Sequence, residues 1–295
     1  MSKKYITVGP YINWHKLQII KRHNVAYLDY GDINNPNILV CAHGLTRNAY
    51  DFEKIARNLL SCFRVIAIDY PGRGNSDYFV DKKHYNYYVY VKDTLLFLKK
   101  LGINKPFWLG TSMGGVIGMA IASFYPKIIR GLILNDIGPE MPIATLKKIS
   151  KYASQEPTFT DLNLAKQHLK MIYKGSGIKD EEDWEFITQN SFKINNENQY
   201  QMNYDPAVTS GIQINPKKTK DVDMWKIWRK ISCPIFLVHG SKSDILLSST
   251  VEKMQQTKQI ELHRVEYAGH APALTNIDQI EPIKNWLTKF TKQNI

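Results

Sequence analysis

The sequence predicts an α/β protein, with a mostly parallel β-sheet, helices on both of its faces and one helical insertion. Three observations support this prediction. Short apolar runs alternate with amphipathic segments in the first half of the chain, a rhythm typical of a parallel sheet. The rhythm breaks between residues 139 and 220 and resumes from 221. The length of 295 residues is enough for one large domain with an insertion.

The first elements read as strands. "LQIIKR" (17–22) and "VAYLDYG" (25–31) are expected to pair as a hairpin around His23 and Asn24. "NILVCAHG" (37–44) is an almost continuous apolar run, which predicts a strand covered on both faces. The elements expected next are a helix at 52–60, a strand at 63–70, a helix at 87–102, a strand at 106–110, a helix at 113–125 and a strand at 129–138.

The middle of the chain contains three amphipathic helix candidates without strands between them, followed by a polar stretch: 144–153, 162–173, 181–192 and then 193–206. Alternation returns with a helix at 221–231, a strand at 234–240, a helix at 248–257, a strand at 260–269 and a helix from Ile277. We therefore expect a core made of 1–138 and 221–295. The helical insertion, 139–220, follows a central strand on the side where α/β sheets bind ligands, and is expected to act as a lid.

Composition narrows the class of protein. The chain is 43% hydrophobic and 22% charged, as soluble globular proteins are. It has no apolar run long enough to span a bilayer and no apolar leader at its start. Cys41, Cys62 and Cys233 are odd in number and far apart, which favours free thiols in a reducing cytoplasm. The net charge of +12 comes from scattered lysines. No nucleic-acid partner is therefore expected, and a basic surface that binds nucleic acid or anionic membrane is the alternative.

One short motif carries most of the chemical information. "GTSMG" (110–114) matches G-x-S-x-G. An apolar strand ends at Leu109 and a helical pattern opens at Met113, which is the strand–turn–helix setting of a nucleophile elbow. Ser112 is therefore the candidate nucleophile, and the plainer interpretation is a glycine-eased structural corner.

A serine hydroxyl needs a base to take its proton and a third group to orient that base. His270, in "EYAGHAPAL", and Asp244, in "VHGSKSDIL", each follow an expected strand. They are the expected base and acid. Asp136, in "LNDIGP", ends the strand after the elbow helix and is the alternative acid. The backbone N–H groups of Leu45 and Met113 are expected to form an oxyanion hole.

These motifs together resemble those of the α/β-hydrolase superfamily, in the lid-bearing group of esterases, carbon–carbon bond hydrolases, enol-lactonases and cofactor-free haloperoxidases. The matching segments are "HGLT" (43–46), "DYPGRGNSD" (69–77), "GTSMGG" (110–115), "HGSKSD" (239–244) and "GHAP" (269–272). The resemblance implies an eight-stranded, mostly parallel sheet and a Ser-His-Asp triad that uses no cofactor. Related dehalogenases and epoxide hydrolases carry aspartate at the elbow. A serine there implies acyl chemistry, and the "PGRGNSD" loop is given no catalytic role.

The expected function is a serine hydrolase that cleaves a small carboxylic ester, lactone or similar acyl substrate through an acyl-enzyme on Ser112. A carbon–carbon bond hydrolase or an acyltransferase with the same triad is an alternative, and so is a catalytically silent binding protein of this fold. The sequence leaves the substrate and the oligomeric state open.

Other side chains of the expected site are assigned by position alone. Trp184, Phe186 and Tyr204 in the insertion are candidates for the substrate pocket, with core packing as the alternative. His43 and His239 each precede a glycine after an apolar strand and are expected to orient loops. No metal site is expected, because no His, Asp and Glu cluster has metal-ligand spacing.

Overall fold

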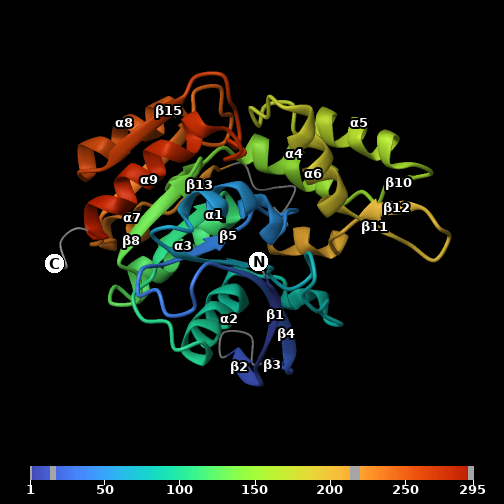
Figure 1. The fold of residues 1–295 in the computed structure, drawn as a ribbon, viewed down its shortest axis with the longest axis horizontal. Coiled ribbons are helices and arrows are strands. Elements are labelled where there is room, and N and C mark those ends of the chain that lie inside the picture. The colour runs from blue at the N-terminus through green and yellow to red at the C-terminus, as the bar shows by residue number, and fades with distance from the viewer. Residues whose placement is uncertain (1, 14–17, 213–219, 292–295) are drawn as a thin grey trace.

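The computed structural model describes residues 2–13, 18–212 and 220–291. Its centre is an eight-stranded sheet in the order β1-β4-β6-β5-β7-β8-β14-β15, with helices on both faces (Figure 1). The six strands from β6 to β15 run parallel, and β4 and β1 add an antiparallel edge. The predicted fold class is confirmed. The strands are β1 (Ser2–Val8), β4 (His23–Tyr30), β5 (Ile38–Ala42), β6 (Arg64–Ile68), β7 (Phe107–Thr111), β8 (Gly131–Asn135), β14 (Ile235–Gly240) and β15 (Glu261–Val265).

The parallel strands separate two apolar clusters, because successive side chains of a strand point to opposite faces. Val40 and Trp108 belong to one cluster, whereas their chain neighbours Leu39 and Phe107 belong to the other. The first cluster is covered by α2 (Tyr87–Lys100), α3 (Met113–Phe124), α7 (Trp225–Lys230) and α8 (Ser248–Thr257). The second is covered by α1 (Glu53–Leu59), preceded by the 3₁₀ turn η1 (Ala49–Phe52), and by α9 (Ile277–Thr291). No helix in these described ranges is long and apolar enough to cross a bilayer.

The hairpin expected from 17–22 and 25–31 is wrong. β4 pairs with β1 and β6 instead, and the short β2 (Tyr11–Asn13) and β3 (Gln18–Ile20) pair with each other. Seven of the eight β4 residues are buried, and a buried strand needs partners on both edges to satisfy its backbone. β1 alternates exposed and covered side chains, as an edge strand does. Leu17 lies outside the described residues.

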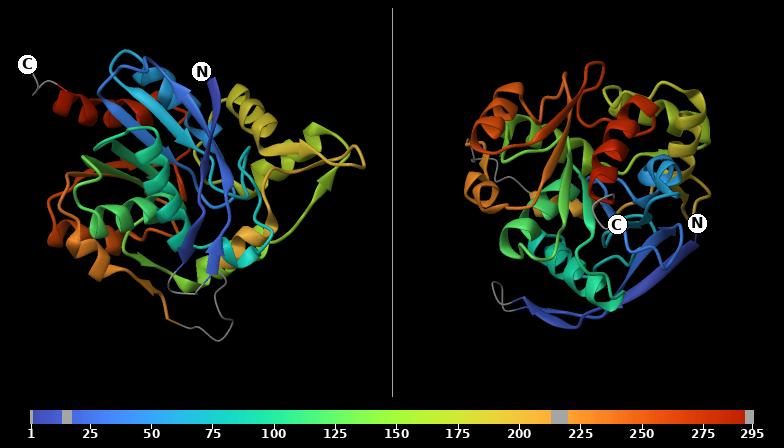
Figure 2. Two further views of the ribbon diagram at one scale, coloured as in Figure 1. Left: turned by 90° about the horizontal axis from the view of Figure 1, so that it is seen from below. Right: turned by 60° about the vertical axis from the view of Figure 1, so that its left-hand side comes forward.

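Between β8 and β14 the chain leaves the main sheet. Helices α4 (Ile143–Ala153), α5 (Leu162–Ile172) and α6 (Glu181–Ser191) lie where the sequence predicts them. They extend to one side of the sheet (Figures 1 and 2). The short strands β9 (Glu140–Met141) and β13 (Val222–Asp223) pair and bring the two ends of this segment together. Residues 213–219, the end of the expected insertion, lie outside the described part of the chain.

The expectation that this segment has no strands is wrong. β10 (Thr158–Phe159), β11 (Phe192–Ile194) and β12 (Tyr200–Met202) form a three-stranded sheet, and the 3₁₀ helix η3 (Pro206–Ile212) follows. The β11–β12 turn explains why the polar stretch folds. The side chain of Asn195 accepts hydrogen bonds from the Glu197 and Gln199 amides. Asn198 adopts φ +59°, a conformation that asparagine tolerates.

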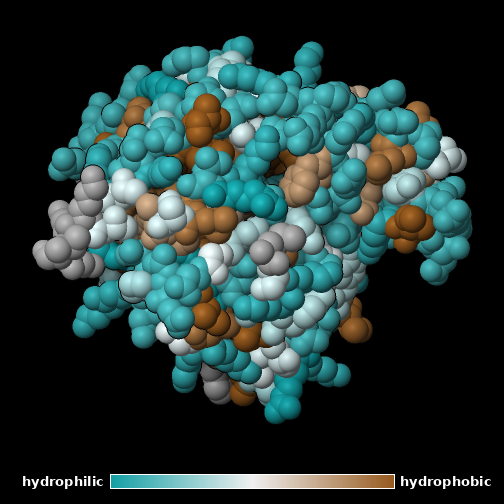
Figure 3. Space-filling model, in the orientation of Figure 1, coloured by the Kyte–Doolittle hydropathy of each residue, from teal (hydrophilic) through white to brown (hydrophobic). Residues whose placement is uncertain are grey.

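The surface agrees with the composition. The face shown in Figure 3 is mostly hydrophilic, with apolar side chains in small, separate groups. Many lysines and arginines form ion pairs with nearby carboxylates, such as Lys54 with Asp183 and Lys289 with Glu261. Part of the positive charge is therefore neutralised locally.

Helix α3 packs so closely on the sheet that one glycine leaves no room for a side chain. A Cβ at Gly114 would lie 2.0 Å from the carbonyl oxygen of Ala42 in β5. We expect Gly114→Ala to lower the free energy of unfolding by about 2–3 kcal/mol, measured by urea denaturation, because helix and strand must separate. Gly175→Ala is the matched control. Its Cβ would meet nothing closer than 3.7 Å, and we expect a change below about 0.5 kcal/mol. Equal losses in the two variants would contradict this close approach.

Candidate active site

Ser112 occupies a sharp turn between β7 and α3. Its backbone has φ +49° and ψ −110°, a region that a non-glycine residue adopts only when its surroundings enforce it. Its N–H donates to the Asn135 carbonyl at 3.1 Å, and its carbonyl accepts from the Gly115 and Val116 amides. The turn therefore has the strand–turn–helix geometry of a nucleophile elbow.

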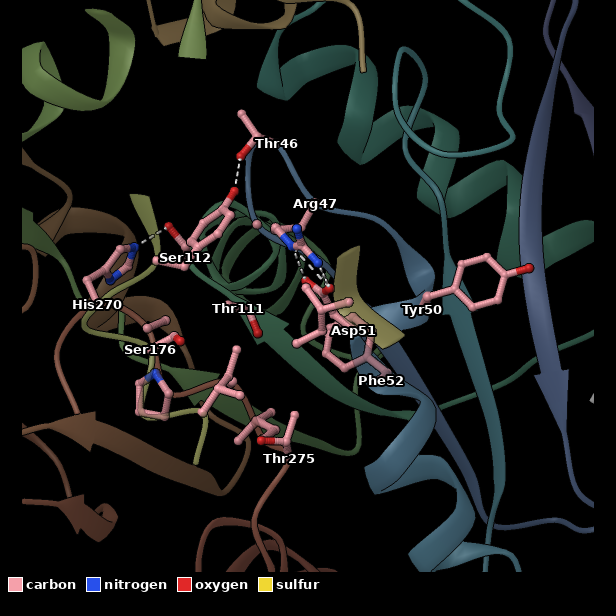
Figure 4. Close-up of a pocket in the computed structure, with 18 of the residues that line it drawn as sticks. Thr46, Arg47, Tyr50, Asp51, Phe52, Thr111, Ser112, Ser176, His270 and Thr275 are labelled. Atoms are coloured by element: carbon pink, nitrogen blue, oxygen red, sulfur yellow. Dashed lines mark hydrogen bonds and ion pairs between the residues drawn. The ribbon is translucent and has the colours of Figure 1, made fainter. Parts of the chain in front are cut away.

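The side chains of Ser112, His270 and Asp136 form one continuous hydrogen-bonded chain. His270 Nε2 lies 2.9 Å from Ser112 Oγ, and His270 Nδ1 lies 2.8 Å from Asp136 Oδ2. Nδ1–H donates to the carboxylate, so the Nε2 lone pair is left to accept the serine proton. The His270 side chain is 14% exposed and that of Asp136 is fully buried. Figure 4 shows the imidazole directed at Ser112.

Asp136 is held by two further donors. The Gly240 amide donates to Oδ1 at 2.8 Å, and the Ser243 hydroxyl donates to Oδ2 at 2.5 Å. Together with His270, these bonds compensate the buried carboxylate. The strand order explains the contact: Asp136 directly follows β8, which lies between β7 and β14. The carboxylate therefore projects beside the elbow.

The expectation that Asp244 pairs with His270 is wrong. Asp244 is exposed, and its carbonyl accepts from the Thr145 hydroxyl of α4. The loop after β14 turns early, because the Ser243 amide bonds back to the Gly240 carbonyl. Ser243 thus faces the site, one residue before Asp244. Of the two acids that the sequence left open, the structure brings Asp136 to the histidine.

Two backbone donors next to Ser112 are unused. Within the described residues, the N–H groups of Leu45 and Met113 have no hydrogen-bond acceptor. Both residues line a small cavity at Ser112 with a volume of about 30 Å³, room for one water-sized group. The other residues around this cavity are apolar side chains and Tyr87: Tyr87, Val116, Ile137, Met141, Leu146, Ile149 and Ile245. Free donors at this place are available to a developing negative charge.

A larger cavity, with a volume of about 130 Å³, is also lined by Ser112. His270 and Leu45 border it, as do residues of the segment between β8 and β14. Figure 4 shows Ser176 and Thr275 on the His270 side of this cavity, with the Arg47–Asp51 ion pair across it. The hydroxyl oxygens of Ser176 and Thr275 are buried and have no hydrogen-bond partner within the described residues. Both residues line the cavity, and neighbouring atoms cover their hydroxyl oxygens.

The pocket candidates from the sequence divide into two groups. Phe186 lines the larger cavity, together with Asp183 and Ile187 on the same face of α6. Trp184 and Tyr204 are buried in the apolar core and are absent from the linings of both described cavities. Trp184 lies one residue from Asp183, so the turn of the helix directs it elsewhere. Lining residues such as Tyr152 and Tyr173 carried no sequence signal, because they belong to no motif.

The loop after β5 forms hydrogen bonds with the segment between β8 and β14. The Thr46 hydroxyl bonds to Tyr173 at 2.8 Å, Arg47 donates to Ser191 at 2.7 Å, and Asn48 donates to the carbonyl of α6 residue Asn190 at 2.6 Å. One wall of the larger cavity is therefore tied to the loop that carries Leu45.

His43 and His239 hold loops. His43 Nδ1 donates to the Gly44 carbonyl, and its Nε2 accepts from the Tyr70 amide. Burial lowers the pKa of His43 to about 3, so it stays neutral. His239 Nε2 donates to the Leu246 carbonyl, and its Nδ1 accepts from Arg264. Among the residues with described positions, no group of three or more His, Cys, Asp or Glu side chains could hold a metal ion.

The family of the chain follows from comparison with known proteins. A model of the alpha/beta hydrolase fold family matches residues 37–277. The chain is an α/β hydrolase. The superfamily that the motifs suggested is thereby confirmed, and the chain is a hydrolase of this fold.

Relatives of this α/β hydrolase include proteins with described activities. It is 32% identical over 265 residues to the 3-hydroxybutyrate-oligomer hydrolase of Cupriavidus necator, covering 88% of this chain and 90% of the relative. A provisionally described hydrolase from Rickettsia typhi has a crystal structure that superposes with a TM-score of 0.94 at 49% identity, covering 98% of this chain and 99% of that one. An α/β hydrolase from Novosphingobium aromaticivorans gives a TM-score of 0.83 at 29% identity, with 98% of both chains covered.

Proposed function

We propose that this α/β hydrolase is a serine esterase that cleaves small carboxylic esters through an acyl-enzyme on Ser112. The supporting observation is the unbroken chain of hydrogen bonds from Ser112 Oγ through His270 to Asp136, next to two unused backbone donors. A merely structural serine would not require a histidine aligned in this way beside a cavity.

In the first half-reaction, Ser112 Oγ attacks the ester carbonyl carbon as His270 Nε2 takes the serine proton. The carbonyl oxygen becomes an oxyanion and accepts hydrogen bonds from the Leu45 and Met113 amides. Asp136 stabilises the imidazolium that forms. When the intermediate collapses, the bond to the alcohol oxygen breaks and His270 gives its proton to the leaving alcohol.

In the second half-reaction, a water molecule enters the larger cavity, which His270 lines. His270 takes one proton of this water while its oxygen attacks the acyl carbon. A second oxyanion forms at the same two amides. The bond to Ser112 Oγ then breaks, Ser112 regains a proton from His270, and the carboxylic acid leaves.

We assign the role of a lid to residues 139–220, with 1–138 and 221–295 as the core. Tyr173 and Asp183 from this segment line the larger cavity, so its position sets the size of the substrate and limits the entry of water.

The substrate that we favour is a short polyester of a 3-hydroxy acid. One reason is the Cupriavidus necator relative, which is named for hydrolysis of 3-hydroxybutyrate oligomers. The other reason is the cavity. Besides the ester that is cleaved, an oligomer carries a terminal hydroxyl, a terminal carboxylate and any further ester carbonyls. Rotation of the Ser176 or Thr275 side chain, both in the cavity wall, would turn an unpartnered hydroxyl toward these groups. A fluorophosphonate probe tests the chemistry first: we expect covalent labelling of Ser112.

The 3-hydroxybutyrate dimer is expected to be a better substrate than butyl butyrate, which has one ester and no other polar group. We expect kcat/KM to be at least about tenfold higher for the dimer, since one or two additional hydrogen bonds contribute about 1 kcal/mol each. Ser176→Ala and Thr275→Val should each lower kcat/KM for the dimer several-fold and leave butyl butyrate hydrolysis unchanged.

The outcomes separate the two levels of the proposal. Equal kcat/KM for the dimer and butyl butyrate, with Ser112 labelled, rejects the polyester substrate and keeps the esterase. An intact protein that neither reacts with the probe nor hydrolyses p-nitrophenyl butyrate rejects the esterase. Ester products formed with added alcohols would assign acyl transfer instead.

A further inference from the structure

Arg73 is a fully buried arginine whose charge is not neutralised by a carboxylate. Its side chain has no solvent exposure. It donates to the carbonyls of Leu45 at 2.8 Å and Pro71 at 2.9 Å, to the Tyr90 hydroxyl at 2.6 Å and to the sulfur of Met113 at 3.5 Å. All four acceptors are neutral. In the described part of the chain it forms no ion pair, whereas the buried Arg64 is paired with Asp29.

A buried, unpaired guanidinium is costly, because removing its charge from water costs several kcal/mol unless a counter-charge is present. Four hydrogen bonds and the faces of Tyr85 and Tyr90 recover part of this cost. The guanidinium carbon lies 5.8 Å and 5.1 Å from the centres of these two rings. A neutral side chain of similar size would pack there without that cost. The charge itself is therefore the feature that needs an explanation.

Two of the four acceptors belong to Leu45 and Met113, the residues whose backbone N–H groups have no acceptor among the described residues. One guanidinium contacts both Leu45, in the loop after β5, and Met113, the first residue of α3. These two chain segments are 68 residues apart in sequence. Arg73 thus links the Leu45 backbone to the Met113 side chain beside the small cavity.

The loop formed by the "DYPGRGNSD" motif (69–77) directs Arg73 into the protein. Gly74 has φ +56°, and a Cβ on it would lie 2.4 Å from the Asp69 carboxylate. Asp69 in turn accepts from the Ala49 and Asn75 amides. The loop is therefore folded tightly enough to turn Arg73 inward. From the sequence alone, no catalytic role is expected for this motif.

We propose that Arg73 is a positioning residue of the oxyanion hole, a role that rests on the ester chemistry proposed above. It holds Leu45 and Met113 so that their N–H groups converge on one point. Its charge then gains a counter-charge only when the oxyanion forms beside those two residues. The interaction is thus stronger in the transition state than in the ground state, which is the condition for raising kcat.

Arg73→Met tests this role, because methionine keeps an apolar side chain of similar length without the charge or the donors. We expect kcat for p-nitrophenyl butyrate to fall about 100-fold, with KM changing less than about threefold. Arg73→Lys keeps the charge but cannot contact both residues as a guanidinium does, and should retain activity within about tenfold of the wild type. All rates are expressed per site labelled by a fluorophosphonate.

A ligand pair separates positioning from structural support. A trifluoromethyl ketone adds to the serine: Oγ bonds to the ketone carbon, the serine proton moves to His270, and the ketone oxygen becomes an oxyanion. The matching methyl ketone binds without this step. Arg73→Met should weaken the trifluoromethyl ketone about 100-fold and leave the methyl ketone unchanged.

Arg64→Met is the matched control. It also removes a buried arginine, whose partner is Asp29 and not a residue of the candidate active site. It should therefore lower stability and leave both inhibitor affinities unchanged. Parallel weakening of the two ketones by Arg73→Met, or wild-type kcat in its folded fraction, would overturn the proposal for Arg73 and keep the esterase. A wild-type protein without labelling or turnover would reject both.

Discussion

Ser112→Ala is expected to lower kcat for p-nitrophenyl butyrate by at least about 10⁴-fold and to abolish fluorophosphonate labelling. The substitution removes the proposed nucleophilic oxygen, while His270 and the two amides remain. The fold should persist, because within the described residues Ser112 Oγ makes one hydrogen bond, to His270. Alanine tolerates the φ of +49° no worse than serine does. Activity, labelling and the thermal unfolding midpoint are the measurements.

An exposed serine supplies the control for this substitution. Ser248 begins α8 on the surface, and Ser248→Ala should be labelled and active like the wild type. Activity within tenfold of the wild type in Ser112→Ala, after contaminating esterases are excluded by labelling, would remove Ser112 from the mechanism.

Asp136→Asn should lower kcat about 10⁴-fold, the loss measured for the equivalent change in a serine protease. The amide has no charge to stabilise the imidazolium, and its NH₂ group can face Nδ1. The histidine would then carry its proton on Nε2, where it cannot accept the serine proton. The Gly240 amide keeps the amide oxygen as its acceptor, and the Ser243 hydroxyl can accept from the NH₂ group, so the turn should survive.

Asp244→Asn is the matched control, with the same chemical change at the position that the sequence favoured. Because Asp244 is exposed and does not contact His270, we expect kcat to change less than about twofold. The pair is best compared under identical conditions with p-nitrophenyl butyrate. A large loss in Asp244→Asn with a small one in Asp136→Asn would return the acid role to Asp244.

The parallel sheet and the elbow could be predicted because each rests on a local pattern. Apolar runs such as 37–44 identify buried strands wherever their partners lie, and the setting of Ser112 is a motif within a few residues. The N-terminal pairing could not be predicted in the same way. "LQIIKR" is apolar enough for a strand, but the strand that pairs with β4 is formed by residues 2–8. In sequence, these residues alternate only weakly between apolar and polar types.

The acid illustrates a different limit. Asp136 and Asp244 both follow apolar strands, and sequence position does not distinguish them. The choice depends on how far the loop after β14 runs before it turns, which is set by backbone hydrogen bonds such as the one from Ser243 to Gly240. Arg73 illustrates a third limit: its contacts join three segments of the chain, and a pattern along one segment does not reveal them.

The hydrogen-bonded chain from Ser112 to His270 spans 158 residues of sequence, and this has a consequence for the timing of folding. Contacts of such separation form only after the intervening chain has collapsed. During synthesis, the elbow and the acid emerge long before the strand that positions the base. On the proposed mechanism, a nascent chain therefore holds a serine without a proton acceptor until β15 has been made and has docked on the sheet.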